Sequence, residues 1–378
     1  MKIRKPDYYD RFQCIAGACS DSCCIGWEID VDEERRSAYR EVEGALGERL
    51  RTCIDWEEGH FILQGKEERC PFLNSENLCD LIIGLGEESL CEICREHPRY
   101  YEWYEDLTEA GVGLCCEAAA KLILESEEPT RFVETWEPDE AEDSCEYNED
   151  ETDLSENEQT DDESDDTLEV LFEARETAYQ ILQNRSVSIW SRLHTFMNYI
   201  EELQQALDFE NLDEVEESAE YYREQEPAHD LKVDYHKLID CCRKLEPMDE
   251  SWPDHLKCLD ELIQDADVLE KLEEQFHEQF AERDYEYEHL AVYFVYRYFM
   301  KCRKDADVYS RGCLTAFCVA LIHLLDLETF AKQGNCSKED RAMNAKKCSK
   351  EIEYSEENLA ILADLFWEHG FEEILEAL

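Results

Sequence analysis

The sequence predicts a mainly α-helical protein, with an N-terminal cysteine-rich metal-binding module that contains short strands and a C-terminal helical domain. Three observations predict this organisation. Eleven of the 20 cysteines lie within the first 116 residues, a strongly acidic stretch follows them, and apolar residues then recur at helical spacing. Because domains commonly hold about 100–200 residues, the 378-residue chain has room for such parts. We expect the module at residues 1–130, a linker at 131–167 and the helical domain at 168–378.

The net charge restricts the partners. The chain has 96 Asp and Glu residues against 37 Lys and Arg residues, which gives a net charge of -59. Such a surface repels nucleic acid and anionic membranes, so we expect neither as a partner, and it favours a basic protein. The longest apolar runs, 290–300 and 313–325, are shorter than the roughly 20 residues that a membrane span needs.

The N-terminus and the cysteines together predict the compartment. The first ten residues carry charge but no apolar segment follows them, so we expect no signal peptide and a cytoplasmic protein. Thiols stay reduced in the cytoplasm. Closely spaced cysteines then indicate a metal–sulfur site in preference to a disulfide framework.

Short elements are expected between the cysteines. The alternation of Trp27, Ile29 and Val31 predicts a strand, and residues 32–52 are expected to form a helix with Asp32 as its N-cap. A second short strand is expected at 61–63. Turn-forming residues at 74–77 predict a hairpin-like loop flanked by Cys70 and Cys79. Further helical segments are expected at 78–85, 90–95 and 115–125.

The acidic stretch separates the two parts. From Pro138 to Asp166, 16 of 29 residues are Asp or Glu and none is Lys or Arg. Self-repulsion and the lack of apolar residues predict a disordered linker. Composition favours a solvated spacer over an acidic lure for a basic substrate.

The chain beyond the linker is predicted to be helical. A nearly all-apolar helix at 311–331 should be buried, whereas residues 335–350 are expected to form a loop. The chain should end in one or two helices over 355–377, with Ser355 as an N-cap. The other helical segments are expected at 168–182, 189–200, 230–245 and 255–280, and an aromatic-rich run covers 284–300.

The cysteine spacing carries the strongest chemical signal. Thiolates bind zinc or iron–sulfur centres when several converge, and Cys91-x2-Cys94 has a common metal-binding spacing. There are more cysteines than one four-ligand centre needs, so two sites, or one site with neighbouring cysteines, remain open. The alternative, cysteine as a small apolar core residue, suits Cys241, Cys258, Cys302, Cys313 and Cys318. The candidate metal ligands are Cys14, Cys19, Cys23, Cys24, Cys70, Cys79, Cys91, Cys94 and Cys116.

Two sets of motifs resemble the flagellin lysine N-methylase (FliB) family. The N-terminal set is Cys14-x4-Cys19-x3-Cys23-Cys24-x2-Trp27, Cys70-Pro71-Phe72-Leu73, Leu78-Cys79, Cys91-x2-Cys94-Arg95 and Pro98-Arg99. The second set is 171–175 with 183–185, 290–298 and 353–359, so the resemblance spans nearly the whole chain. The cysteine half by itself also resembles smaller zinc- or iron-chelating cysteine-cluster proteins.

The resemblance implies a protein-lysine N-methyltransferase that moves a methyl group from S-adenosylmethionine to lysine side chains of flagellin or another lysine-rich protein. It also implies a cysteine-bound iron–sulfur centre, 4Fe-4S in type, with zinc as the alternative. Neither a glycine-rich nucleotide loop nor a Cys-x3-Cys-x2-Cys triplet is found in the sequence. The alternative function is a non-enzymatic zinc- or iron-binding protein that serves as an acidic adaptor.

Two further groups of residues carry open interpretations. Aromatic walls lower the pKa of a lysine and attract cations, and such walls could come from residues 285–299 or 100–104, although core packing is favoured for any single ring. Arg175, Arg185 and Arg297 lie in otherwise apolar helical segments. They are expected either in buried ion pairs or in a functional cleft.

Overall fold

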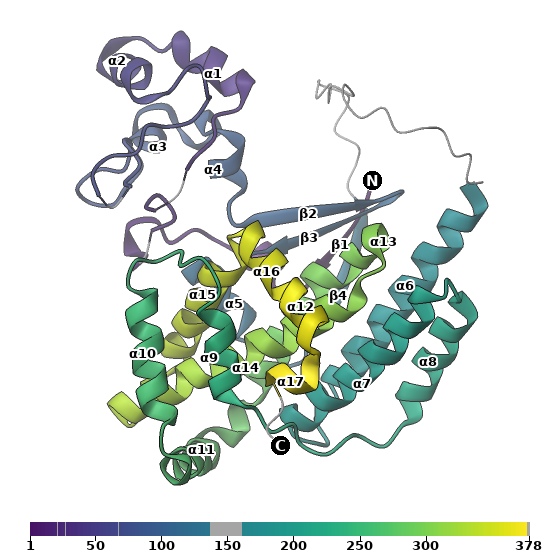
Figure 1. Cartoon of the computed structure of the whole chain (residues 1–378). Coiled ribbons are helices and arrows are strands. Elements are labelled where there is room, and N and C mark those ends of the chain that lie inside the picture. The colour runs from purple at the N-terminus through teal and green to yellow at the C-terminus, as the bar shows by residue number, and fades with distance from the viewer. Residues whose placement is uncertain (21, 27, 67, 137–160, 376–378) are drawn as a thin grey trace. The chain divides into compact units, whose positions relative to one another are not determined.

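The computed structural model describes residues 1–20, 22–26, 28–66, 68–136 and 161–375 (Figure 1). The chain divides into two compact units. The N-terminal unit comprises Lys2–Leu122 and Phe132–Thr135, and the helical unit comprises Met1, Ile123–Arg131 and Trp136–Leu378. Most of the predicted acidic linker lies outside the described residues, so the prediction of its disorder stays untested.

A small mixed sheet belongs to the N-terminal unit. Its strands are β1 (Lys2–Pro6), β2 (Arg99–Tyr104), β3 (Leu107–Val112) and β4 (Phe132–Trp136), in the order β2-β3-β1-β4. β2 and β3 are antiparallel neighbours, whereas β1 runs parallel to β3. Arg4 on β1 pairs with Glu109 on β3 at 3.2 Å and with Glu134 on β4 at 2.7 Å. This arginine therefore ties together segments that are far apart in the sequence.

The strand predicted at residues 27–31 is not part of this sheet. Trp27 lies outside the described residues, and Asp30 forms only an isolated bridge with His60. The second predicted strand, at 61–63, is likewise limited to a bridge between Ile54 and Phe61. The true strand β3 is buried at all six positions, so its sequence lacks the alternation that marks a half-exposed strand.

The helices of the N-terminal unit are short. The predicted N-cap is confirmed, because Asp32 Oδ1 accepts the backbone N–H of Arg35 at 2.9 Å. The single helix predicted over 32–52 is two helices, separated at residues 41–43. The helices are α1 (Glu33–Arg40), α2 (Gly44–Cys53), α3 (Asp80–Leu85), α4 (Glu92–Glu96) and α5 (Glu117–Ile123), with 3₁₀ turns at Tyr9–Arg11, Ala16–Ala18 and Glu87–Ser89.

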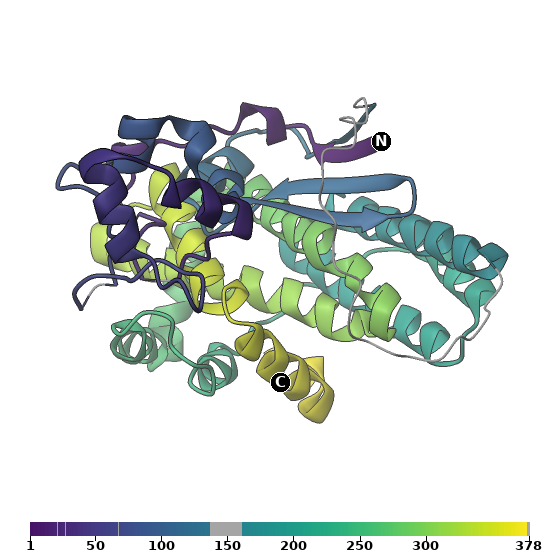
Figure 2. The same ribbon diagram turned by 90° about the horizontal axis from the view of Figure 1, so that it is seen from above.

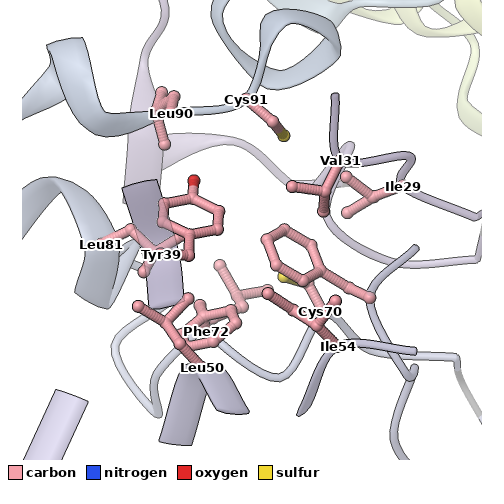
Figure 3. Packing of buried hydrophobic residues seen from close by; sticks show 12 residues of the cluster. Ile29, Val31, Tyr39, Leu50, Ile54, Cys70, Phe72, Leu81, Leu90 and Cys91 are labelled. Atoms are coloured by element: carbon pink, nitrogen blue, oxygen red, sulfur yellow. The ribbon is translucent and has the colours of Figure 1, made fainter. Parts of the chain in front are cut away.

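A hydrophobic cluster holds these short elements together (Figure 3). The Phe72 side chain is completely buried, and its ring centroid lies 5.1 Å from that of Phe61. Tyr39 is 1% exposed and its hydroxyl donates to the carbonyl of Ser89 at 2.7 Å. With so little regular structure, the unit depends on this packing for its stability.

The helical unit is confirmed as all-helical over the residues described. Its helices are α6 (Asp161–Leu182), α7 (Ile189–Asp208), α8 (Leu212–Glu224), α9 (Tyr235–Cys242), α10 (Trp252–Ile263), α11 (Ala266–Phe280), α12 (Tyr285–Tyr298), α13 (Cys302–Asp305), α14 (Val308–Gln333), α15 (Lys338–Glu353), α16 (Glu356–His369) and α17 (Phe371–Leu375), with 3₁₀ turns at Ala281–Arg283 and Phe299–Lys301. Figures 1 and 2 show α6, α7 and α8 lying side by side.

Helix α14 is the core of the helical unit and packs against α7, α12, α15 and α16. Among the described residues it is the one helix long and apolar enough to cross a bilayer, but 94% of its apolar window is buried inside the protein, as expected for a core helix. At its contact with α7, a Cβ on Gly312 would lie 2.6 Å from Cγ2 of Ile200. Only glycine therefore fits this helix contact.

The loop expected at 335–350 was a wrong prediction, because residues 338–353 form α15. The helix begins with a capping box in which Ser337 and Asp340 satisfy each other's backbone N–H groups. Its sequence is rich in charge. Arg341 and Glu353 are buried in ion pairs, and Glu351 is buried against a backbone N–H.

The side chain of Glu351 makes the stability of the helical unit depend on pH. It is 2% exposed, and burial raises its pKa from 4.5 to about 7 although Oε2 accepts the backbone N–H of Met248 at 2.9 Å. The folded state therefore retains a proton that the unfolded state releases between pH 4.5 and about 7. This contribution is fully present below pH 4.5 and is lost as the pH rises through about 7.

We expect Glu351→Gln to become more stable relative to the native chain as the pH rises from 5 to 8, by on the order of 2–3 kcal/mol. The measurement is urea denaturation of both proteins at each pH. Glu357→Gln, an exposed change on α16, is the matched control and should show a constant difference. A constant difference for Glu351→Gln as well would contradict the assignment.

Candidate functional site

Five of the predicted ligands gather around the hydrophobic cluster of the N-terminal unit. Cys70 and Cys91 belong to the cluster (Figure 3). Cys24, Cys79 and Cys94 pack against it. Three separate segments supply them. The backbone joins two of these segments, because the N–H of Cys70 donates to the carbonyl of Cys24 at 2.8 Å.

The local fold explains how these thiols meet. The predicted hairpin-like loop is confirmed, since Leu73 and Cys79 form a bridge and the side chain of Asn74 accepts the N–H groups of Glu76 and Leu78. Cys91 stands at the start of the short helix α4 with Cys94 one turn further on. Oδ2 of Asp32 accepts the N–H of Glu92 at 2.9 Å and so fixes α4 beside α1.

The other predicted ligands lie next to this group. Cys23 interacts electrostatically with Cys14 and Cys116, and directly with Cys24. Cys19 is in a different setting, because its thiol donates to Oε2 of Glu117 at 3.7 Å. All 19 described cysteines are reduced. The cysteines thus form one group of five and a smaller neighbouring group, while Cys19 bonds to Glu117.

The thiols differ in acidity. The hydrogen bond from Cys23 lowers the pKa of Cys24 to about 7, helped by Ser22 and Arg69, while the same bond raises the pKa of Cys23. A hydrogen bond from Cys94 likewise lowers the pKa of Cys91. Each pair therefore contains one thiol that becomes a thiolate readily, and the thiolate is the form that binds metal.

Burial has the opposite effect on the remaining two thiols of the group. It raises the pKa of Cys70 to about 12 and also raises the pKa of Cys79. A bound cation would reverse this effect, because a coordinating thiol is deprotonated outright. The chemistry of the donor set therefore fits a soft metal or an iron–sulfur centre.

The described side chains are not arranged as a complete coordination sphere. Within the part of the chain that the structure describes, no three His, Cys, Asp or Glu side chains are placed to hold one ion together. The thiols associate in pairs, Cys23 with Cys24 and Cys91 with Cys94. The structure therefore brings five predicted ligands to one core, but the metal itself stays a prediction.

The aromatic run predicted as a possible lysine-binding wall packs the core of the helical unit. Its seven rings, at residues 285–299, are all at most 7% exposed. On β2, Tyr104 is buried, whereas Trp103 is 67% exposed and lies 6.3 Å from Tyr101. The core-packing interpretation therefore holds for α12, and β2 retains an accessible aromatic side chain.

The open question of the three arginines is answered by ion pairing and ring contacts. Arg185 pairs with Glu288 at 2.8 Å and Arg297 with Glu353 at 3.4 Å. Arg175 is 2% exposed, and its guanidinium lies over three aromatic rings at 5.2–5.7 Å. The single cysteines accepted as core residues are buried with one exception, because Cys258 is exposed.

These features define a protein with two units. One is rich in cysteines and gathers five of them around its core, and the other is helical. The profile of the FliB lysine N-methylase C-terminal domain matches residues 175–378, more than half of the chain. The chain belongs to the FliB lysine N-methylase family. The resemblance found in the sequence motifs is thereby confirmed.

Relatives of known name cover part of the chain. It is 26% identical over 137 residues to a Lysine-N-methylase of Salmonella typhimurium, an alignment that spans 33% of each protein. A Lysine-N-methylase of Salmonella choleraesuis gives the same coverage and identity. The Flagellar biosynthetic protein FliU of Salmonella muenchen is 26% identical over 136 residues, 33% of this chain and 78% of FliU. No solved structure matches the chain.

Sequence reasoning overlooked two arginines near candidate sites. Arg69 acts on Cys24 and was hidden among the charged residues before Cys70. Arg223 lines a pocket of the helical unit, in a segment for which no helix was predicted. Its neighbours in the sequence, the aromatic pair Tyr221 and Tyr222, were the one local signal.

Proposed function

We propose that this protein is a protein-lysine N-methyltransferase that transfers a methyl group from S-adenosylmethionine to lysine side chains of flagellin. The observation that carries the proposal is the family match over residues 175–378. The names of the relatives, Lysine-N-methylase and Flagellar biosynthetic protein, support the reaction and the flagellar substrate.

The reaction makes two demands on the protein. The substrate lysine, with an ordinary pKa near 10.4, must lose a proton before its nitrogen attacks the methyl group. The C–S bond of the sulfonium then breaks as the N–C bond forms, leaving S-adenosylhomocysteine. The net charge of -59 attracts lysine-rich surfaces of the substrate and increases their rate of encounter.

We place an iron–sulfur centre on Cys24, Cys70, Cys91 and Cys94, with zinc as the alternative. These four act on one another electrostatically, because the Cys94 thiol experiences the other three. Cys79 interacts with Cys24 and is the neighbouring thiol. When bound, such a centre supplies a redox-active group and cross-links three loops of the unit. Reduced thiols of this kind support a cytoplasmic location.

The test of the centre is the iron and sulfide content of protein purified without oxygen. We expect a broad absorption band near about 400 nm in the native chain, and loss of most of the iron in Cys94→Ser, since one thiolate ligand is removed. Cys258→Ser is the matched control, because that cysteine is exposed on α10, and it should retain the iron. Colourless protein containing zinc would exclude the redox centre.

The test of the activity is transfer of a labelled methyl group to purified flagellin. We expect incorporation into lysine, found by mass spectrometry of the digested flagellin, that depends on S-adenosylmethionine. A protein that binds flagellin but transfers no methyl group would instead fit the acidic adaptor.

A further inference from the structure

A pocket opens on the surface of the three-helix group α6, α7 and α8. Its volume is about 60 Å³. Since one water needs about 10–15 Å³ of such space, the pocket accommodates a group of a few heavy atoms. Its lining residues are Gln180, Ile181, Asn184, Val187, Arg192, Thr195, Tyr222, Arg223, Gln225 and Pro227.

The pocket has a buried floor and a polar rim. Arg192 on the floor is 3% exposed, and Thr195 beside it is 5% exposed. The rim carries the exposed amides Gln180, Asn184 and Gln225, together with other residues of the lining. The hydroxyl of Thr195 accepts the N–H of Ala228 at 2.8 Å and so holds the loop after α8 against the floor.

The floor arginine is only partly neutralised. Nη1 of Arg192 pairs with Glu288 at 2.8 Å, but the same carboxylate also binds Nε and Nη2 of Arg185. One carboxylate therefore serves two guanidinium groups, although Glu128 also acts on Arg185. Arg192 also donates from Nε to the carbonyl of Ser188 and from Nη1 to that of Leu182. Asp284 also acts on Arg192, but burial raises the pKa of that carboxyl group and so disfavours its charged form.

The rim arginine has no carboxylate partner among the described residues. Nε of Arg223 donates to Oγ1 of Thr177 at 3.0 Å, which fixes the plane of the guanidinium. In the described part of the chain, no bond is recorded for its Nη1 and Nη2. An arginine without an acid partner is unexpected in a chain in which 96 of 378 residues are acidic.

The charge of the pocket lining is opposite in sign to the net charge of the protein. None of its ten residues is acidic and two are arginines, whereas the chain has a net charge of -59. Guanidinium groups bind carboxylates through paired, charge-assisted hydrogen bonds. Amide oxygens on the rim suit an ammonium group. This combination matches the two ends of an α-amino acid.

We propose that this pocket binds an α-amino-acid carboxylate, and that its source is the methionine end of the methyl donor S-adenosylmethionine. The proposal rests on the function proposed above. The pocket takes only the amino-acid end, because its volume is too small for the nucleoside. Arg192 and Arg223 bind the carboxylate, and the amide oxygens of Gln180, Asn184 and Gln225 accept the ammonium.

The test is calorimetric titration of the full chain, without flagellin, with S-adenosylmethionine and with decarboxylated S-adenosylmethionine, which keeps the sulfonium but lacks the carboxylate. We expect the native chain to bind the first ligand about 10- to 100-fold more tightly, the value of a charged hydrogen bond pair. In Arg223→Ala the ratio of the two affinities should fall towards one. Arg223→Lys should give an intermediate ratio, because lysine keeps the positive charge but lacks the paired N–H donors of the guanidinium group.

Arg243→Ala is the matched control, since it removes one positive charge from a surface ion pair of the same unit. Thermal unfolding and circular dichroism should be native-like in all variants. Equal affinities for the two ligands, or unchanged binding in Arg223→Ala, would overturn the pocket assignment. The proposed function is tested separately, because methylation of flagellin by the native chain would uphold it even then. Binding of L-methionine without binding of S-adenosylmethionine, dependent on Arg223, would keep the carboxylate pocket and overturn the methyl donor as its ligand.

Discussion

Replacement of Arg341 by methionine is expected to destabilise the helical unit by about 3–5 kcal/mol. Arg341 on α15 is 1% exposed, and its Nη1 donates to Oε2 of Glu286 at 2.8 Å. Its Nε lies 3.7 Å from Oδ2 of Asp326. Methionine fills a similar space but leaves the buried Asp326 without its arginine partner and Glu286 with Arg283 alone, which is the source of the cost.

The aromatic surroundings add to this effect. The Arg341 guanidinium lies 4.9 Å from the ring centroid of Tyr287 and 5.1 and 5.4 Å from those of Phe276 and Phe280. Cation–π contacts are stronger in such a desolvated setting. Helices α11, α12, α14 and α15 therefore meet around one charge, and its loss should loosen all four.

Urea denaturation followed by circular dichroism measures the change. The control Arg243→Met breaks an exposed ion pair and should cost at most about 1 kcal/mol. Adding Asp326→Asn to Arg341→Met should recover part of the loss, because it removes the buried acid whose arginine partner is gone. Equal unfolding free energies for Arg341→Met and its control would refute the burial argument.

The second large effect is expected in the N-terminal unit. Phe72→Ala removes a completely buried ring that contacts Phe61 and lies 5.1 Å from the Arg49 guanidinium. Such a deletion leaves a cavity and costs about 3–5 kcal/mol. Since Phe72 stands between Cys70 and Cys79 on the hairpin-like loop, the thiol group should lose its arrangement as well.

Hydrogen exchange measured by mass spectrometry distinguishes the two units. We expect faster exchange over residues 24–94 in Phe72→Ala, with the helical unit unchanged. Ile83→Ala, on the same segment but 64% exposed, should change the unfolding free energy by no more than about 0.5 kcal/mol. Native exchange rates in Phe72→Ala would mean that the cluster does not hold the unit together.

The two proposals divide the chemistry between the units. The cysteine group belongs to the N-terminal unit, whereas the pocket with Arg192 and Arg223 belongs to the helical unit that the family profile covers. The iron measurement and the ligand titration are therefore independent. If Cys94→Ser loses its iron but binds S-adenosylmethionine as the native chain does, the metal centre and the donor pocket are independent sites.

Local patterns in the sequence determined most of the helical unit. Helix caps are formed by neighbouring residues, so Asp32 and Ser355 could be assigned from a few positions, and both are confirmed. The long apolar run was identified correctly as a buried helix, since 94% of its apolar window lies inside the protein. Cysteine spacing selected five thiols that gather around one hydrophobic cluster, and their binding of a metal stays a prediction.

Only the tertiary structure decided the sheet, helix α15 and the pocket. The parallel pairing of β1 with β3 joins residues about 100 positions apart, and a fully buried strand shows no alternation. The segment of α15 was expected to be a loop, whereas Arg341 on this helix is buried against partners on α12 and α14 that are distant in the sequence. Arg223 is distinguished by having no carboxylate partner among the described residues, which only the structure shows. Each of these features depends on long-range contacts, which a local pattern does not contain.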